Sequence, residues 1–373
     1  MLRGMKVKPG PQVYRYDDEA FELIPEILQE FQAKNVLIVH GTISWEKAEP
    51  YLTFLSNDNY QFTYHQYSGE CSYDGMEVIK QIVPINNIDF IIGVGGGKLA
   101  DLVGVSAHFI NVPFGVVPTI ASNCAPWTPL SVMYKENGES EGKSEHYLRQ
   151  AAFFITSPTL VIDSPERYFV AGMADTIAKW YESDAILAQA HLRDLPFLKV
   201  AQYTTEISKD IILEQGEQAL SDMREGTVTE AFKNVSEIIF GVAGLVGGLG
   251  DKYARNAAAH AMHDGLGKYM SEESHHFIHG EIVAYGIFYQ MALEQRFDEI
   301  DKLIPFYERM NLPKSLADMN ITLEDNEVLD NVIAFIDSKE KVHLLPMEIN
   351  KEVLKEAVFA LENNFESIKS DYL

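Results

Sequence analysis

Three side chains of metal-ligating type stand in three separate segments of the chain. Asp175 lies in Ala-Gly-Met-Ala-Asp-Thr-Ile, His260 in Asn-Ala-Ala-Ala-His-Ala-Met, and His279 in Phe-Ile-His-Gly-Glu. One carboxylate and two imidazoles form a three-ligand set, which leaves a divalent metal with open coordination positions. An open position allows a metal to polarise a substrate oxygen. If the fold brings these residues together, they predict a metal-assisted reaction.

Histidines are concentrated around the second and third of these residues. Five fall within twenty positions: His260, His263, His275, His276 and His279. His260 and His263 are three residues apart and therefore share one face of a helix. A helical histidine is also common in protein cores and on surfaces, and His275 and His276 are equally compatible with an exposed loop. The cluster favours a metal site without excluding these ordinary roles.

A second candidate site lies upstream, where an apolar run leads into a glycine-rich turn. Residues 90–94 precede Gly95, Gly96 and Gly97, and Lys98 follows. Glycines let a backbone approach a ligand closely, and amides at a helix N-terminus face phosphate oxygens. Lys98 stands where G-x-G-x-x-G needs its last glycine, and a leucine follows it where a Walker A loop has Ser or Thr. An ordinary tight turn between a strand and a helix is the alternative.

Composition restricts the class of protein. The 373 residues suffice for two domains, and 46% hydrophobic with 23% charged residues are typical of a soluble globular protein. A formal net charge of −25 disfavours nucleic-acid partners and anionic membranes, because both attract basic surfaces. The only cysteines are Cys71 and Cys124, which fits a reducing cytoplasm. The N-terminus lacks the apolar core of a signal peptide, and no run of about 18 apolar residues predicts a membrane span.

The hydrophobic pattern changes near residue 165. Before it, short apolar runs alternate with helical patterns, which predicts crossover units and a mostly parallel sheet. The expected strands are 36–39, 62–67, 89–94, 114–118 and 160–163, with helices at 76–83 and 99–108. Beyond it, apolar residues recur at helical spacing over 173–190, 201–222, 227–245, 256–270, 282–296 and 351–368. We therefore expect an α/β domain over residues 1–165 and an all-helical domain over residues 166–373.

Taken in order, these motifs resemble the iron-containing alcohol dehydrogenase superfamily, and within it the glycerol-dehydrogenase-like branch. The matching segments are Gly-Val-Gly-Gly-Gly-Lys with Asp101, Pro118-Thr-Ile-Ala-Ser122, Leu130-Ser-Val-Met-Tyr134, Gly-Met-Ala-Asp175, Ala-Ala-Ala-His260-Ala-Met-His-Asp-Gly and His279-Gly-Glu. They extend over nearly the whole chain. The resemblance implies a Rossmann-like N-terminal domain with a parallel sheet and an all-helical C-terminal domain, the architecture that dehydroquinate synthase shares.

The resemblance also implies roles for individual residues. Asp175, His260 and His279 would bind one divalent metal, with His276 as the alternative to His279. Lys179 stands where many iron-using relatives carry a further histidine, so zinc is expected rather than iron. An NAD or NADP cofactor would lie on the glycine turn and on residues that line its nicotinamide and ribose. These residues are Gly95, Gly96, Gly97, Lys98, Asp101, Thr119, Ser122, Thr128, Leu130 and Tyr134.

Two departures from glycerol dehydrogenases bear on the substrate. The loop Ala-Ser-Asn-Cys-Ala-Pro places Cys124 where those enzymes carry an aspartate, so a carboxylate that binds polyol hydroxyls and repels anions is missing. Arg255, five residues before His260, offers a bidentate fork for a carboxylate. Together with Trp127, these features resemble a hydroxycarboxylate dehydrogenase subgroup, and we expect reduction of small 2-oxo acids to 2-hydroxy acids. A cysteine that merely fills space and a surface arginine are the plain alternatives. Glycerol dehydrogenase and, more remotely, a dehydroquinate-synthase-like lyase are the alternative functions.

The remaining expectations concern the cofactor, the proton and the partners. Gly41 stands where NAD-preferring relatives place an aspartate for the ribose 2′-hydroxyl. We therefore expect NADP to be accepted as well as NAD, and a preference for NADP is the sharper form of this prediction. His263 is a candidate for completing proton transfer near the substrate, because no dedicated general base stands out. The expected partners are a small-molecule substrate and further copies of the chain in a homo-oligomer.

Overall fold

The computed structural model describes residues 4–270, 276–322 and 326–371. The chain divides into two compact units. The sheet unit comprises Lys8–Phe169 and Gln218–Gly244, and the helical unit comprises Met1–Val7, Val170–Glu217 and Leu245–Leu373. The domain boundary between residues 165 and 166 stays a prediction.

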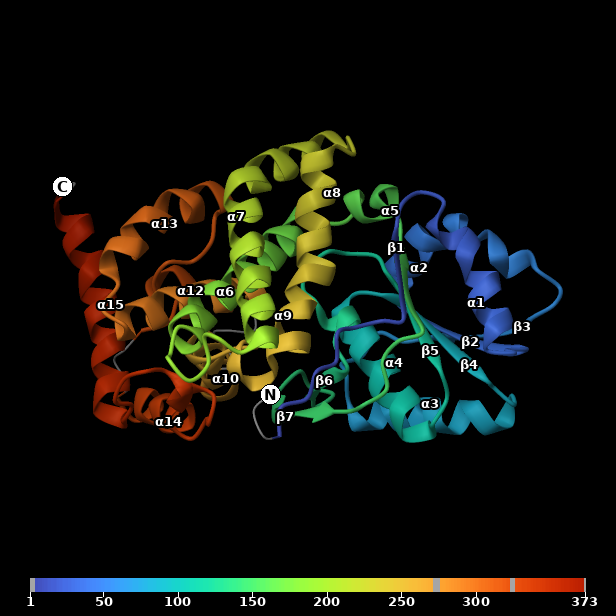
Figure 1. Ribbon diagram of the computed structural model, residues 1–373, viewed down its shortest axis with the longest axis horizontal. Helices are drawn as coiled ribbons and strands as arrows, with labels where there is room; N and C mark the ends of the chain where they lie inside the picture. Colours follow the sequence, from blue (N-terminus) through green and yellow to red (C-terminus); the bar gives the residue numbers. More distant parts are fainter. Residues whose placement is uncertain (1–3, 271–275, 323–325, 372–373) are drawn as a thin grey trace. The chain divides into compact units, whose positions relative to one another are not determined.

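Six parallel strands form the sheet unit, in the order β1-β8-β5-β4-β2-β3 (Figure 1). Their bounds are β1 (Val13–Tyr16), β2 (Asn35–His40), β3 (Gln61–Gln66), β4 (Phe90–Gly95), β5 (Phe114–Pro118) and β8 (Phe153–Thr156). Parallel strands that are covered on both faces need almost continuous apolar sequence. Every residue of β4 and of β5 is buried accordingly. The predicted Rossmann-like parallel sheet is confirmed.

Alternate residues of the central strands face opposite layers of helices. Phe90 and Ile92 of β4 pack in an apolar cluster with Ile24 of α1 (Ile24–Glu30) and Ala48 of α2 (Thr42–Ala48). Gly93 faces the other layer, because a Cβ there would lie 3.1 Å from the side chain of Val103 in α4. Helices α3 (Tyr73–Ile85) and α4 (Gly97–Ile110) form that second layer (Figure 1). The glycine turn between β4 and α4 is therefore held by a strand and a helix that are both well packed.

One predicted strand is wrong. Residues 160–162 belong to helix α5 (Pro158–Ile162), and the nearby strand is β8, which ends at Thr156. The hydroxyl oxygen of Ser157 accepts from the backbone N–H of Thr159, and Pro158 occupies the first helical turn. A capping serine followed by proline starts a helix even where the next residues are apolar and partly β-branched.

The sheet unit also contains an antiparallel hairpin, a further helix and several short helical turns. These elements are β6 (Leu130–Tyr134), β7 (Ser140–His146), α8 (Glu230–Glu237), η1 (Ala20–Leu23), η2 (Glu49–Tyr51), η3 (Thr53–Ser56), η4 (Ala125–Trp127) and the π-helical turn η5 (Ile238–Val242).

The helical unit confirms the predicted all-helical C-terminal part. It contains the greater part of α6 and α7, together with a series of further helices and three short turns. Their bounds are α6 (Glu166–Leu187), α7 (Pro196–Glu225), α9 (Ala243–Gly250), η6 (Asp251–Tyr253), α10 (Ala258–Tyr269), α12 (His279–Leu293), α13 (Phe297–Met310), η7 (Ala317–Met319), α14 (Asn326–Asp337), η8 (Val342–Leu344) and α15 (Lys351–Asp371).

One helical stretch, Glu230–Tyr253, is long and apolar enough to cross a membrane by length and composition alone. Within its most apolar window, 67% of the residues are buried inside the protein. A long apolar stretch that is mostly buried in this way is typical of a protein core.

Candidate active site

The glycines of this turn allow close packing rather than an unusual backbone conformation. Gly95 ends β4, Gly96 is the N-cap of α4, and α4 begins at Gly97. None of the three adopts the left-handed conformation that favours glycine. A Cβ on Gly96 would lie 2.8 Å from the side chain of Ile120, and a Cβ on Gly97 would lie 2.7 Å from Oδ1 of Asn123. Side chains at these two positions are therefore excluded by the segment that follows β5.

The other predicted cofactor residues lie at the same edge of the sheet. Gly41 follows β2 as the N-cap of α2, and Thr119 follows β5 and donates its backbone N–H to the carbonyl of Gly95 at 3.1 Å. Ser122, Thr128, Leu130 and Tyr134 continue from this edge through η4 and β6. Strands β2 and β4 are neighbours at the point where the strand order reverses. Open parallel sheets bind ligands beyond the carboxyl ends of their strands at such a point.

Lys98 and Asp101 have protein partners in this structure. The Lys98 ammonium pairs with Glu70 at 2.5 Å. Asp101 is buried and its Oδ2 accepts the backbone N–H of Val132 at 3.0 Å, while the Ser131 hydroxyl donates to its carbonyl at 2.7 Å. Burial raises the pKa of Asp101 to about 8. These contacts fasten strand β6 to helix α4, and a contact between Asp101 and the cofactor stays a prediction.

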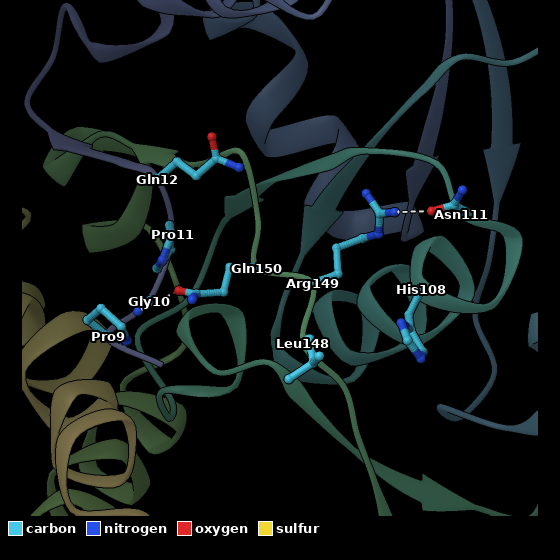
Figure 2. Close-up of a pocket in the computed structure, with 9 residues that line it drawn as sticks. All are labelled: Pro9, Gly10, Pro11, Gln12, His108, Asn111, Leu148, Arg149 and Gln150. Carbon is cyan, nitrogen blue, oxygen red and sulfur yellow. Dashed lines mark hydrogen bonds between the residues drawn. The ribbon is translucent and has the colours of Figure 1, made fainter. Parts of the chain in front are cut away.

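A shallow pocket of about 750 Å³ lies at the opposite edge of the sheet (Figure 2). Its wall combines the end of α4 with the segments 9–12 and 148–150. Arg149 donates to the side chain of Asn111 there, and Leu148 is exposed (Figure 2). None of the predicted cofactor or metal residues lines this pocket, so the hollow does not mark the predicted chemistry.

In the helical unit, α6, α10 and the first residue of α12 bring the three predicted metal ligands together. Nε2 of His260 lies 3.1 Å from Oδ1 of Asp175, and Nε2 of His279 lies 3.2 Å from the same oxygen. The three ligand atoms all lie within 4.8 Å of one another. The side chains of Asp175 and His260 are buried, whereas that of His279 is 35% exposed. The site is therefore closed on the side of Asp175 and His260 and open on the side of His279, where a further ligand could enter.

Two glycines of α12 allow this convergence. A Cβ on Gly280 would lie 1.9 Å from the carbonyl oxygen of Ala171 in α6, and a Cβ on Gly286 would lie 2.4 Å from that of Ala259 in α10. Helix α12 therefore contacts the backbones of both neighbours without intervening side chains. This close approach places His279 beside Asp175.

Glu182 holds His260 in one orientation. Its Oε1 accepts the backbone N–H groups of Ala257 at 2.7 Å and His260 at 2.9 Å, and its Oε2 lies 2.6 Å from Nδ1 of His260. Because a carboxylate only accepts, Nδ1 of His260 donates its proton to Glu182, and Nε2 is the nitrogen that faces Asp175 and would bind a metal after losing its own proton. The N-terminus of α10 has no side-chain cap of its own. Gln290 completes the capping, since its Oε1 accepts from Ala258 at 2.9 Å.

Sequence reasoning missed Glu182 and Gln290. Glu182 follows Asp175 by two helical turns and so lies on the same face of α6. The run of alanines before His260 contains no capping residue in its first turn, which was the available sign that another segment supplies the cap.

The charges of the site are mutually compensated. Burial alone would raise the pKa of Asp175, but the Lys179 ammonium, 3.8 Å from its Oδ2, and the two imidazoles hold it well below its ordinary value. Burial disfavours the charged imidazolium of His260, but the carboxylates of Glu182 and Asp175 outweigh it and raise its pKa to about 9. Two imidazole nitrogens and one ionised carboxylate oxygen that converge in this way fit a divalent metal.

The remaining predicted residues are placed as follows. His263 contacts His279, with its Nε2 at 3.0 Å from Nδ1 of the latter. Arg255 donates to the carbonyl of Gly247 at 3.1 Å. His276 is exposed in a turn and is not part of the converging group among the described residues, and His275 lies outside them. Cys124 is a partly buried cysteine at the N-cap of η4.

Comparison with known proteins supplies the family. Residues 11–158 match the model of iron-containing alcohol dehydrogenases. The chain is 37% identical over 277 residues to hydroxycarboxylate dehydrogenase A of Escherichia coli (strain K12), covering 73% of this chain and 75% of that protein. It is 27% identical over 362 residues to a glycerol dehydrogenase of Citrobacter freundii, and the match covers 96% of this chain and 97% of that protein. Its fold is similar to the crystal structure of a probable glycerol dehydrogenase from Sinorhizobium meliloti 1021, with a TM-score of 0.85 at 24% identity over 98% and 100% of the two chains.

Proposed function

The chain belongs to the iron-containing alcohol dehydrogenase family, and from this premise we propose that it reduces small 2-oxo acids to 2-hydroxy acids. The family uses NAD(P) and a metal, and its named members are dehydrogenases. The observation that carries the proposal is the convergence of two Nε2 atoms on Oδ1 of Asp175. The proposal adds the substrate class to what the family establishes.

Asp175, His260 and His279 are proposed to hold the divalent metal, and zinc is proposed over iron because Lys179 replaces a fourth ligand. The metal, when bound, supplies a Lewis acid for the oxygen of the reacting carbonyl or alcohol. Glu182 fixes the ligand nitrogen of His260, and Gln290 fixes the start of the helix that carries it. Both supports are buried, so they exclude water from the closed side of the site.

The glycine turn is proposed to bind the pyrophosphate of the cofactor, which supplies the hydride. The backbone N–H groups at the start of α4, which begins at Gly97, are the proposed donors, because the first amides of a helix have no partner within the helix. Gly41 carries no carboxylate that would repel a ribose 2′-phosphate, so NADP is proposed as an accepted cofactor. Michaelis constants for NADPH and NADH measure this, and a large preference for NADH contradicts it.

Two cations of the helical unit bear on a substrate carboxylate. The ammonium of Lys179 is buried and lies 3.8 Å from Oδ2 of the proposed metal ligand Asp175, one helical turn earlier in α6. Arg255 is the candidate from the sequence, and its guanidinium donates to the carbonyl of Gly247. The relative from Escherichia coli, named hydroxycarboxylate dehydrogenase A, supports a substrate of this class. The replacement of an aspartate by Cys124 supports it too, because an anion meets less repulsion there.

The test is a comparison of kcat/KM for a series of 2-oxo acids with that for glycerol, using zinc-loaded enzyme and both cofactors. We expect the 2-oxo acids to be preferred, and a strong preference for glycerol overturns the proposal. Lys179→Met should raise KM for the acids more than KM for an uncharged ketone of equal length. Lys179→Arg is the matched control, because it keeps the positive charge.

Glycerol dehydrogenase is the second candidate function. Relatives with this name match almost the entire chain, among them that of Citrobacter freundii. The substitution Cys124→Asp distinguishes the two candidates: it restores the carboxylate of that branch and should shift kcat/KM towards glycerol. A cytoplasmic homo-oligomer that acts on a small molecule, without nucleic acid or membrane partners, completes the proposal. The charge of −25 supports the lack of nucleic-acid and membrane partners, the use of only two cysteines supports the cytoplasm, and the homo-oligomer is proposed from the family resemblance alone.

A further inference from the structure

A line of hydrogen-bonded side chains runs behind His279. The Lys341 ammonium lies 3.2 Å from Oδ2 of Asp264, and Oδ1 of Asp264 lies 3.0 Å from Nδ1 of His263. Nε2 of His263 lies 3.0 Å from Nδ1 of His279, whose Nε2 faces Asp175 at 3.2 Å. Lys341 follows α14, whereas Asp264 and His263 lie on α10. The line therefore joins two other segments, α10 and the residues after α14, to one proposed metal ligand on α12.

Only one placement of protons in this line is compatible with metal binding. The carboxylate of Asp264 accepts only, so Nδ1 of His263 donates to it. A neutral imidazole has a single N–H, so Nε2 of His263 is an acceptor, and Nδ1 of His279 donates to it. Nε2 of His279 then keeps its lone pair. With both nitrogens of His263 protonated, Nδ1 of His279 would have to accept, and its Nε2 would carry the proton that blocks a metal.

His279 needs such a support more than His260 does. It is the first residue of α12, and the preceding Ile278 offers no side-chain hydrogen bond to fix the ring. Its side chain is 35% exposed, compared with 10% for His260, which Glu182 already holds. An imidazole at the open flank can rotate unless its second nitrogen is bound. His263 supplies that bond.

We propose that His263 and Asp264, with Lys341 behind them, are positioning residues that keep the Nε2 lone pair of His279 directed at the metal. This inference rests on the proposed function, because it assumes that Asp175, His260 and His279 bind the metal. It gives His263 a different task from proton transfer to the substrate. It also predicts an order of importance, with His263 first, Asp264 second and Lys341 last.

Binding of cobalt(II) to the metal-stripped full-length protein tests the inference without any assay of turnover. In His263→Gln, an amide oxygen replaces the nitrogen that faces His279; in His263→Asn, the amide reaches only the position that faces Asp264. We expect His263→Asn to bind cobalt about 10- to 100-fold more weakly, the usual effect of removing such a support. His263→Gln should stay within about threefold of the wild type, and its visible cobalt spectrum should be unchanged. Asp264→Leu should bind cobalt more weakly than Asp264→Asn, since only the amide oxygen of Asn can still accept from Nδ1–H of His263.

The outcomes separate the two proposals. Equal cobalt affinity and equal spectra for His263→Asn and His263→Gln overturn the positioning role, while a wild type that binds cobalt leaves the proposed function standing. A wild type that binds no better than His260→Ala overturns the metal site itself, and the positioning role with it. Both variants at position 263 are polar and of similar size, and far-UV circular dichroism verifies that each is folded. If His263→Asn is unfolded, the Asp264 pair decides in the same way: equal affinities overturn the inference.

Discussion

Two buried carboxyl groups, Asp101 in the sheet unit and Glu182 in the helical unit, are treated in opposite ways. Asp101 accepts one backbone N–H, from Val132, and its other oxygen has no hydrogen-bond partner among the described residues. Burial then raises its pKa to about 8. Glu182 accepts two backbone N–H groups and faces an imidazole, and His260 together with these amides lowers its pKa in spite of burial.

The difference reflects the different roles of the two buried acids. Asp101 fastens a hairpin to a helix, and a protonated carboxyl does this as well as an ionised one. Glu182 must accept from two amides with one oxygen and from Nδ1–H of His260 with the other, and only an ionised carboxylate has two oxygens that both accept without donating. The fold supplies Glu182 with enough donors to keep that charge in a buried place. Substitutions at the two positions should consequently have opposite effects.

The largest expected effect is that of Glu182→Leu. It leaves two amides of α10 and the ring of His260 without their acceptor, and breaking a buried charged network typically costs about 3–5 kcal/mol. We expect a strong loss of stability in denaturant unfolding and no detectable zinc by mass spectrometry. Glu182→Gln is the matched control: its oxygen still caps the helix, but it cannot hold both the amides and Nδ1–H of His260. It should remain folded and bind zinc about 10- to 100-fold more weakly. Zinc binding by Glu182→Leu at the wild-type level contradicts the support role.

The second effect concerns the pH dependence of the metal-free protein. His260 has its pKa raised from 6.5 to about 9 in the fold. A raised pKa contributes stability that is fully present below the unfolded value and is lost as pH rises through the folded value. The melting temperature of the metal-free protein should therefore fall between about pH 6.5 and pH 9. Added zinc should stabilise more strongly across the same range, because the proton that competes for Nε2 leaves. A flat profile of the metal-free protein over this range contradicts the ionised His260–Glu182 pair.

The third effect concerns the close approach of α12 to its neighbours. Gly280→Ala places a Cβ against the carbonyl of Ala171, which is backbone and cannot rotate away. Overpacking of this kind costs about 1–3 kcal/mol and should move His279 from Asp175. Zinc affinity and unfolding free energy should fall together. Gly267→Ala is the control, because outside its own helical turns no atom of the described residues lies within 4 Å of its Cβ position in α10, and it should be neutral or stabilising. If both variants behave alike, the spacing of these helices does not depend on Gly280.

Local sequence was sufficient for the glycine turn and for the parallel sheet, because both follow from consecutive residues with a strong pattern. Local sequence was misleading for residues 160–163, because their apolar run predicts a strand, whereas Ser157 and Pro158 before them start a helix. The three metal ligands were found through their motifs, and the structure brings their side chains together. Glu182, Gln290 and Lys341 were not found. Each meets its partner across 32 or more residues, so its role depends on which helix faces pack together.

The smallest expected effect is that of Asp101→Asn, and it has the opposite sign to that at Glu182. The amide oxygen can still accept from Val132, and the variant carries no ionisable group in the buried position. In the wild type, a pKa raised from 3.8 to about 8 means that stability falls as pH rises through this range, since the unfolded chain releases the proton more readily. Asp101→Asn should therefore melt a few degrees above the wild type at pH 9 and lose that advantage at pH 5. Its Michaelis constant for NADPH should stay close to that of the wild type if the carboxyl only fastens the hairpin. A tenfold increase in this Michaelis constant with an unchanged melting profile would instead place Asp101 in contact with the cofactor. The two buried acids would then differ in what they bind, cofactor or histidine, rather than in their state of ionisation.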